Sequence, residues 1–109
     1  MEPGVVVACA AFGIDPRSVV RSSGGLESSV WRVETAEERS YALRRYDRSA
    51  GVDDACVRSE LAWLDALAEE LPEVVPRPLR KADGSLRPFV GDVREGAASA
   101  FWIASTWID

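Results

Sequence analysis

The chain has 109 residues, which is the length of one ordinary domain and too short for two. Its composition, 47% hydrophobic and 28% charged, is typical of a globular protein and excludes general disorder. The net charge of −5 excludes an extended basic surface, so we expect no nucleic acid as a main partner, although a local cationic site for one small anion is compatible with it.

The amino-terminal segment, from Gly4 to Phe12, is short and apolar, and Gly13 and Pro16 are stop signals that follow it. This pattern predicts a short helix. Glu2 stands where a secretion signal would carry basic residues, and Gly13 interrupts the apolar run. Neither a secretion signal nor a membrane span is therefore expected, and we expect a cytoplasmic protein with no membrane partner.

Three segments after this helix are rich in residues that suit a pleated sheet. They run from Ser18 to Arg21, from Ser29 to Thr35 and from Tyr41 to Tyr46. A glycine-containing turn separates the first two, and a short polar turn at residues 36–39 separates the last two. The sequence therefore predicts an antiparallel meander of three strands.

The strongest predicted element is a helix from Asp53 or Asp54 to about Leu71, with an aspartate cap at its start and Pro72 after its end. Its apolar residues repeat with helical spacing and form one stripe, made of Val57, Leu61, Leu64, Ala68 and Leu71. At about 100° per residue, Glu60 falls within this apolar arc, so we expect its carboxylate to face protein.

The remaining segments predict further strands. Pro76-Arg77-Pro78 must be extended because proline excludes helix at both ends. Residues 79–82 and 86–90 flank Asp83-Gly84, which is a favoured hairpin dipeptide. The last run, Ala100 to Ile108, is apolar on both faces and should be covered on both sides. The whole pattern predicts an α+β fold, in which about five mostly antiparallel strands form a twisted sheet with the long helix packed on it.

The cysteines and the tryptophans are expected to have structural roles. Cys9 and Cys56 lack the close spacing of a metal or redox motif and are expected to be small core residues. The four tryptophans are predicted to lie in the core or at an interface, and not in a ligand cage; they are Trp31, Trp63, Trp102 and Trp107.

A cation and a carboxylate on neighbouring elements suggest a phosphate site. A cation on a strand can neutralise phosphate charge when a carboxylate from a neighbouring helix fixes its side chain, and Arg44 and Glu60 could form this pair. Alternation places Arg44 and Arg45 on opposite faces, so only one of them can point into a cleft, and we choose Arg44. The alternative is that both arginines are solvated strand residues and that Glu60 has only a structural partner.

The order of these segments resembles a known family. Ala42-Leu43-Arg44 is similar to the Val-Ala-Ile-Lys strand of protein-kinase-like enzymes. Together with residues 23–35 before it, and residues 59–67 and 75–78 after it, this strand resembles the amino-terminal lobe of the aminoglycoside phosphotransferase and choline kinase superfamily. The resemblance implies one domain over residues 1–109, a protein-kinase-like amino-terminal lobe that ends at the interlobe hinge.

The resemblance also implies the roles of particular residues. Arg44 would take the place of the lysine that contacts the α and β phosphates of ATP, and Glu60 that of the glutamate that orients it. Arginine in place of lysine is a departure, because a planar fork differs from an ammonium in reach and donor geometry. The loop residues implied to lie over the ATP phosphates are Gly24, Gly25, Ser28 and Ser29. The residues implied to begin the hinge, where backbone groups meet the adenine edge, are Trp107, Ile108 and Asp109.

The family's catalytic aspartate and metal ligands belong to its second lobe, in a motif that contains histidine, and this sequence has no histidine. The resemblance therefore implies ATP and Mg²⁺ as cofactors, with no catalytic residue and no metal ligand in this chain. We expect weak nucleotide binding and no catalysis by these residues alone. An apolar face at Trp107 and Ile108 would then meet the absent carboxy-terminal lobe or cause self-association. The alternative is a non-enzymatic interaction module or a degenerate remnant of a kinase-like fold.

Overall fold

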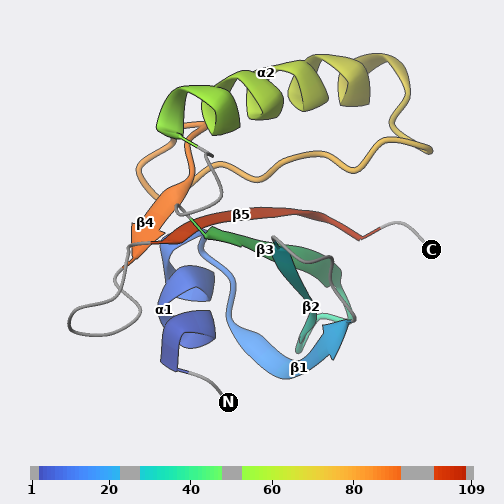
Figure 1. Cartoon of the computed structure of the whole chain (residues 1–109). Helices are drawn as coiled ribbons and strands as arrows, with labels where there is room; N and C mark the ends of the chain where they lie inside the picture. The colour runs from blue at the N-terminus through green and yellow to red at the C-terminus, as the bar shows by residue number, and fades with distance from the viewer. Residues whose placement is uncertain (1–2, 23–27, 48–52, 92–99, 108–109) are drawn as a thin grey trace.

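The computed structural model describes residues 3–22, 28–47, 53–91 and 100–107 (Figure 1). It contains two helices and one sheet of five antiparallel strands in the order β1-β2-β3-β5-β4. The helices are α1 (Pro3–Ala11) and α2 (Asp54–Glu70), and the strands are β1 (Pro16–Ser22), β2 (Ser28–Thr35), β3 (Ser40–Asp47), β4 (Phe89–Gly91) and β5 (Ala100–Thr106). The predicted α+β class, with about five strands, one packed helix and a short amino-terminal helix, is confirmed.

The two helices cover opposite faces of the sheet (Figure 1). Helix α1 packs on a core, here called the α1-side core, that consists of Val5, Ala8, Cys9, Phe12, Ile14, Trp31, Val33, Leu43, Ala100, Trp102 and Ala104. Helix α2 packs on a smaller one, the α2-side core, that consists of Val57, Leu61, Phe101 and Ile103. Burying each large aliphatic or aromatic side chain of these cores contributes about 1.5–3 kcal/mol.

Strand β5 contributes alternate residues to both cores. Ala100, Trp102 and Ala104 lie in the α1-side core, whereas Phe101 and Ile103 lie in the α2-side core. The expectation that this strand is covered on both faces is therefore confirmed. On the α1 side, the rings of Trp31 and Trp102 stack with centroids 5.3 Å apart, which fixes β2 and β5 relative to each other across the intervening β3.

Helix α2 begins as its sequence predicts. The Asp53 side chain accepts a hydrogen bond of 2.8 Å from the backbone N–H of Cys56, which satisfies one donor of the first turn. Along the helix, Val57, Leu61 and Ala68 of the predicted stripe are buried. Within the described ranges, no helix is long and apolar enough to cross a bilayer.

The predicted hairpin around Asp83-Gly84 is only half correct. A turn does form there, since the Lys81 N–H donates to the Ser85 carbonyl and Gly84 adopts a φ of +87°. Its two arms, however, do not pair with each other as strands. Both instead pair with the outer edge of β5: the Leu79 N–H donates to the Ala104 carbonyl at 2.8 Å, and β4 pairs with residues 100–102. The edge of the long strand β5 offers more backbone partners than the short, proline-interrupted arms offer each other.

The prediction of a buried Cys56 is wrong, and Trp63, which was expected in the core or at an interface, lies on the surface. Trp63 is 64% exposed, and Cys56 is also exposed, whereas Trp31, Trp102 and Cys9 are buried as predicted. Both exceptions lie on α2, and at about 100° per residue they fall outside the stripe that contains Val57 and Leu61. The helical position of a residue, and not its apolar character, therefore decides its burial here.

Candidate functional site

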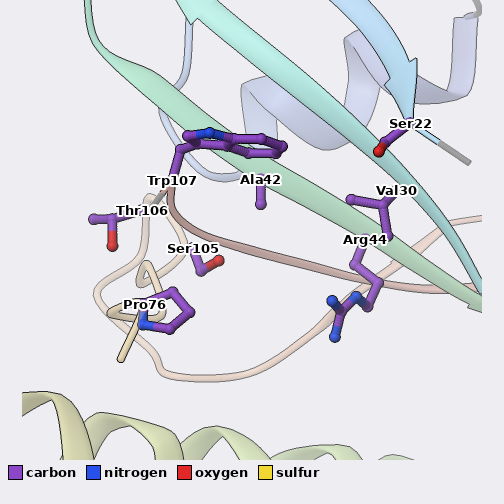
Figure 2. Close-up of a pocket in the computed structure, with 8 residues that line it drawn as sticks. All are labelled: Ser22, Val30, Ala42, Arg44, Pro76, Ser105, Thr106 and Trp107. Atoms are coloured by element: carbon purple, nitrogen blue, oxygen red, sulfur yellow. The ribbon is translucent and has the colours of Figure 1, made fainter. Parts of the chain in front are cut away.

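A pocket of about 340 Å³ opens on the face of the sheet that α2 partly covers. Strands β1, β2, β3 and β5 and the segment before Arg77 all contribute to its wall (Figure 2). Its lining residues are Ser22, Val30, Ala42, Arg44, Pro76, Ser105, Thr106 and Trp107. Among the lining residues that the structure describes, most are apolar or carry a hydroxyl group, and Arg44 is the one with a charged side chain.

Arg44 projects from the middle of β3 into this pocket. Its neighbour Leu43 is fully buried in the α1-side core, whereas Ala42 and Arg44 line the pocket, so the two faces alternate as the sequence predicts. The guanidinium is exposed, and its Nη1 donates a hydrogen bond of 3.2 Å to the hydroxyl oxygen of Tyr46. Figure 2 shows the Arg44 side chain extended from the strand toward the side on which a helix passes.

Glu60 lies half-buried on α2, beside the α2-side core residues Val57 and Leu61. Arg44 and Glu60 are on the same side of the sheet, because the Tyr46 ring packs on that core and shares a strand face with Arg44. Within the part of the chain that the structure describes, however, no ion pair or hydrogen bond joins them. The predicted orienting role of Glu60 stays a prediction.

The opposite flank of α2 is fixed by ion pairs. Arg77 Nη1 lies 3.5 Å from Asp65 Oδ1 and 3.1 Å from Glu69 Oε1. The next residue, Pro78, forms a β-bridge with Ser105 on the outer edge of β5. This flank of the helix therefore faces the β4 edge. At about 100° per residue, Glu60 and Trp63 lie on the other flank, which faces the β3 side of the sheet.

Trp107 closes one end of the pocket. Its backbone N–H donates to the Ser40 carbonyl at 3.2 Å, which extends the pairing of β5 with β3 by one residue. The Arg32 guanidinium lies 5.0 Å from the centroid of the Trp107 ring, within the range of a cation–π contact. Arg32 is itself held by Glu34 at 3.5 Å and by the Ser40 hydroxyl at 3.4 Å. The indole is thus supported by a small charged network on the sheet.

The remaining predicted site residues lie partly outside the described ranges. Gly24, Gly25, Ile108 and Asp109 lie outside the described residues, and for Ser28 only the backbone, which pairs with Tyr46, is described. The hydroxyl of Ser29 accepts a hydrogen bond of 3.0 Å from Arg21, and Ser29 is not among the residues that line the pocket. Their proposed contacts with ATP therefore stay predictions.

Sequence reasoning missed several lining residues. Val30 could have been found, because it is the cross-strand partner of Arg44 in the β2–β3 pair and so shares its face. Ser22 follows in the same way, as the β1 partner of Val30. No pattern in the sequence indicates that Pro76 and Ser105 line the pocket, because their positions depend on how the segment before Arg77 meets the edge of β5.

In the described ranges, the acidic residues do not indicate a metal site and Cys9 does not indicate a nucleophilic site. In those ranges, no group of three or more potential ligands could hold a metal ion. Burial raises the pKa of the Cys9 thiol to about 11, so this cysteine is a core residue and not a nucleophile.

Comparison with known proteins assigns the fold. A comparison with curated proteins found no match. Among solved structures, the chain is similar to amicoumacin kinase hAmiN, determined in complex with AMP-PNP, Ca²⁺ and Ami, with a TM-score of 0.68 and 12% sequence identity. The match covers 98% of this chain and 31% of that chain, so the chain spans less than two thirds of the kinase it matches.

The family comparison agrees with the architecture. The model of the APH phosphotransferase enzyme family matches residues 18–107, a range that runs from β1 through β5 to Trp107 and includes the whole pocket. The resemblance to this superfamily, predicted from the order of the sequence segments, is confirmed, and the fold is that of a kinase-like amino-terminal lobe. The chain belongs to the APH phosphotransferase enzyme family.

Proposed function

We propose that this chain is the ATP-binding lobe of a small-molecule phosphotransferase, and that the pocket around Arg44 and Trp107 is its nucleotide site. The observation that carries the proposal is the projection of Arg44, with its guanidinium group, into a pocket whose other described lining residues are apolar or carry a hydroxyl group. A nucleotide has a flat, largely apolar base and an anionic phosphate tail, so its pocket needs an apolar part for the base and a cationic part for the phosphates.

The two ends of the pocket suit the two ends of ATP. Ala42 and Trp107 provide apolar surface for a base, and the pocket volume of about 340 Å³ lies in the range of small-molecule sites. Arg44 can form charge-assisted hydrogen bonds to phosphate oxygens, and its guanidinium lies away from Trp107 in the pocket (Figure 2). We therefore place the base near Trp107 and the phosphates near Arg44.

The glycine-containing segment supports this orientation. Ser22, the last residue of β1, lines the pocket, and Gly24 and Gly25 follow it in the sequence. Backbone N–H groups of such a segment can approach phosphates closely because glycine carries no side chain. Ser28 and Ser29 would supply hydroxyl groups, and the backbone of Ile108 and Asp109 would continue the hinge beside the base.

The metal and the acceptor are proposed to be bound elsewhere. The similar kinase hAmiN was solved with AMP-PNP and Ca²⁺, which supports a nucleotide and a divalent cation as the ligands of this fold. In the described ranges the residues do not provide a set of metal ligands. We propose that Mg²⁺ and the acceptor are held by residues outside these 109, that catalysis requires them, and that the protein acts where ATP is available, in the cytoplasm.

Titration with ATP and Mg²⁺, followed by tryptophan fluorescence, tests the proposed site. The parent chain should show saturable binding, and Arg44→Ala should weaken it by roughly ten- to a hundredfold, because a hydrogen bond to a charged group is lost. Arg58→Ala is the matched control: Arg58 is an exposed arginine on α2 that pairs with Asp54 at 2.9 Å and does not line the pocket. Equal binding by the parent and by Arg44→Ala would remove Arg44 from the site.

A non-enzymatic interaction module is the second candidate, and the exposed apolar residues favour it. Trp63 is 64% exposed and Val74 is 70% exposed, both on or just after α2. Apolar side chains exposed on this part of the chain could be covered by contact with another chain. This reading predicts that the parent chain shows no saturable response to ATP under any Mg²⁺ condition, which the same titration decides.

A further inference from the structure

Within the described residues, Tyr46 makes the one side-chain hydrogen bond to Arg44. The two residues are separated by one position on β3, so their side chains leave the same face of the strand. The Arg44 Nη1 donates to the Tyr46 hydroxyl oxygen at 3.2 Å. Glu60, the residue that the sequence pattern nominates as the partner of Arg44, makes no ion pair with it in the described ranges.

The Tyr46 ring is itself held in place. It is half-buried and packs against the α2-side core, which includes Val57 and Leu61 from the helix and Phe101 and Ile103 from β5. A side chain packed between a helix and a sheet has few accessible rotamers, so its hydroxyl group occupies a defined position. Tyr46 can therefore transmit the position of α2 to the guanidinium of Arg44.

The chemistry of the contact suits a phosphate-binding arginine. A guanidinium has five N–H donors, so it can keep one on the Tyr46 oxygen and direct others at an anion. A hydroxyl group brings no formal charge to the contact, so this hydrogen bond leaves the positive charge of Arg44 available to a phosphate. A carboxylate in the same place would neutralise part of that charge.

We propose that Tyr46 is the positioning residue for Arg44 and holds its guanidinium ready for the phosphates of the nucleotide. This inference rests on the proposed function, since it assumes that Arg44 binds phosphate. It assigns to a neutral hydroxyl on the same strand the orienting task that the sequence pattern gives to the carboxylate of Glu60. Ordering an exposed arginine before the ligand arrives reduces the entropy that binding must offset.

The decisive measurement is the affinity of Tyr46→Phe for ATP and for adenosine, compared with the parent. The substitution keeps the ring in the α2-side core and removes the hydroxyl alone, so the melting temperature should stay unchanged. ATP binding should weaken by roughly three- to tenfold, as expected for one hydrogen bond, whereas adenosine binding, which involves no phosphate, should not change. Glu60→Gln should weaken ATP binding less than Tyr46→Phe does.

The double variant isolates the coupling between the two side chains. In an Arg44→Ala background, Tyr46→Phe should have no further effect on ATP affinity, because the group that it positions is gone. The proposal is overturned if Tyr46→Phe binds ATP as tightly as the parent, if it weakens ATP and adenosine equally, or if Glu60→Gln has the larger effect.

The failure of this inference is distinguishable from failure of the nucleotide site. If Arg44→Ala binds ATP as well as the parent, the proposed site is wrong and the role of Tyr46 is lost with it. If Arg44→Ala loses ATP while Tyr46→Phe does not, the site stands and the positioning role alone is wrong.

Discussion

Arg32 joins three strands through its side chain. It lies on β2, and the sequence analysis predicted no role for it. Its guanidinium contacts the ring of Trp107, which follows β5, the hydroxyl of Ser40 on β3 and the carboxylate of Glu34 on its own strand. Residues 32 and 107 are far apart in sequence and meet because β2 and β5 both flank β3. Strand alternation cannot reveal such a pair, since it depends on the final order of the strands.

Arg32→Gln should loosen the Trp107 ring. Removing the guanidinium from the ring exposes more of the indole to water, so tryptophan emission should shift to longer wavelength and acrylamide should quench it more strongly. If the base of ATP rests near Trp107, affinity for ATP should fall by roughly two- to fivefold, the effect expected from one exposed cation–π contact. Arg39→Gln, in the turn between β2 and β3, is the control, because Arg39 is exposed and does not line the pocket. Identical spectra for the two variants would contradict the contact.

The pocket residues show how far local rules reach. Alternation on β3 correctly separated Arg44, which lines the pocket, from Leu43, which is buried on the other face. Helical spacing correctly placed Glu60 near the apolar arc of α2. Whether Arg44 and Glu60 touch could not be predicted, because their separation depends on how Val57 and Leu61 dock on β5 and on competition from Tyr46.

At the scale of single elements, α2 depends on its first turn. The hydrogen bond from the Cys56 N–H lowers the pKa of Asp53 below its ordinary value of 3.8, because the ionised carboxylate is the better acceptor. A lowered pKa in the folded state means that the cap stabilises the fold fully above pH 3.8 and loses its effect as the carboxylate is protonated at lower pH. The cap therefore makes the stability of α2 sensitive to acid.

Two variants at this position separate the charge from the cap. Asp53→Ala should lower the melting temperature at pH 7, and the difference from the parent should shrink as the pH falls below 3.8. Asp53→Asn keeps a good capping acceptor without a titrating group, so it should stay close to the parent at pH 7. Thermal denaturation followed by circular dichroism over this pH range gives the comparison. A constant difference between Asp53→Ala and the parent at every pH would rule out a contribution of the carboxylate charge, and equal melting temperatures of the two at pH 7 would rule out the capping role.

The elements of this fold were predictable to different degrees. The helices and the β1–β2–β3 meander follow from local apolar patterns and turn residues, and they form where expected. The structure of the segment from Pro76 to Gly91 does not follow from local patterns, because its dipeptide Asp83-Gly84 signals a turn but does not show what either arm pairs with. A short arm pairs with whatever edge is available, and here that edge is β5, which comes later in the sequence.

For the whole molecule, the exposed apolar surface has a measurable effect. Trp63, Leu71 and Val74 are exposed on α2 and on the segment that follows it, and Trp107 is half-buried at the pocket. We expect concentration-dependent self-association in analytical ultracentrifugation, which Trp63→Gln should reduce. The control is Val20→Gln, because Val20 is as exposed as Trp63 but lies on β1, at the opposite edge of the sheet from β4. A strictly monomeric parent over a wide range of concentration would contradict the prediction.

The place of β5 in the sheet has a consequence for synthesis of the chain. Ribosomes deliver the segments in order, and β5 follows every strand and helix that it joins. Half of the α2-side core, Phe101 and Ile103, comes from this strand, as does the Trp102 partner of Trp31. A nascent chain that has not yet released β5 from the exit tunnel leaves Val57 and Leu61 without a surface to pack on. During that interval α2 is a natural target for chaperones that recognise unburied apolar helices.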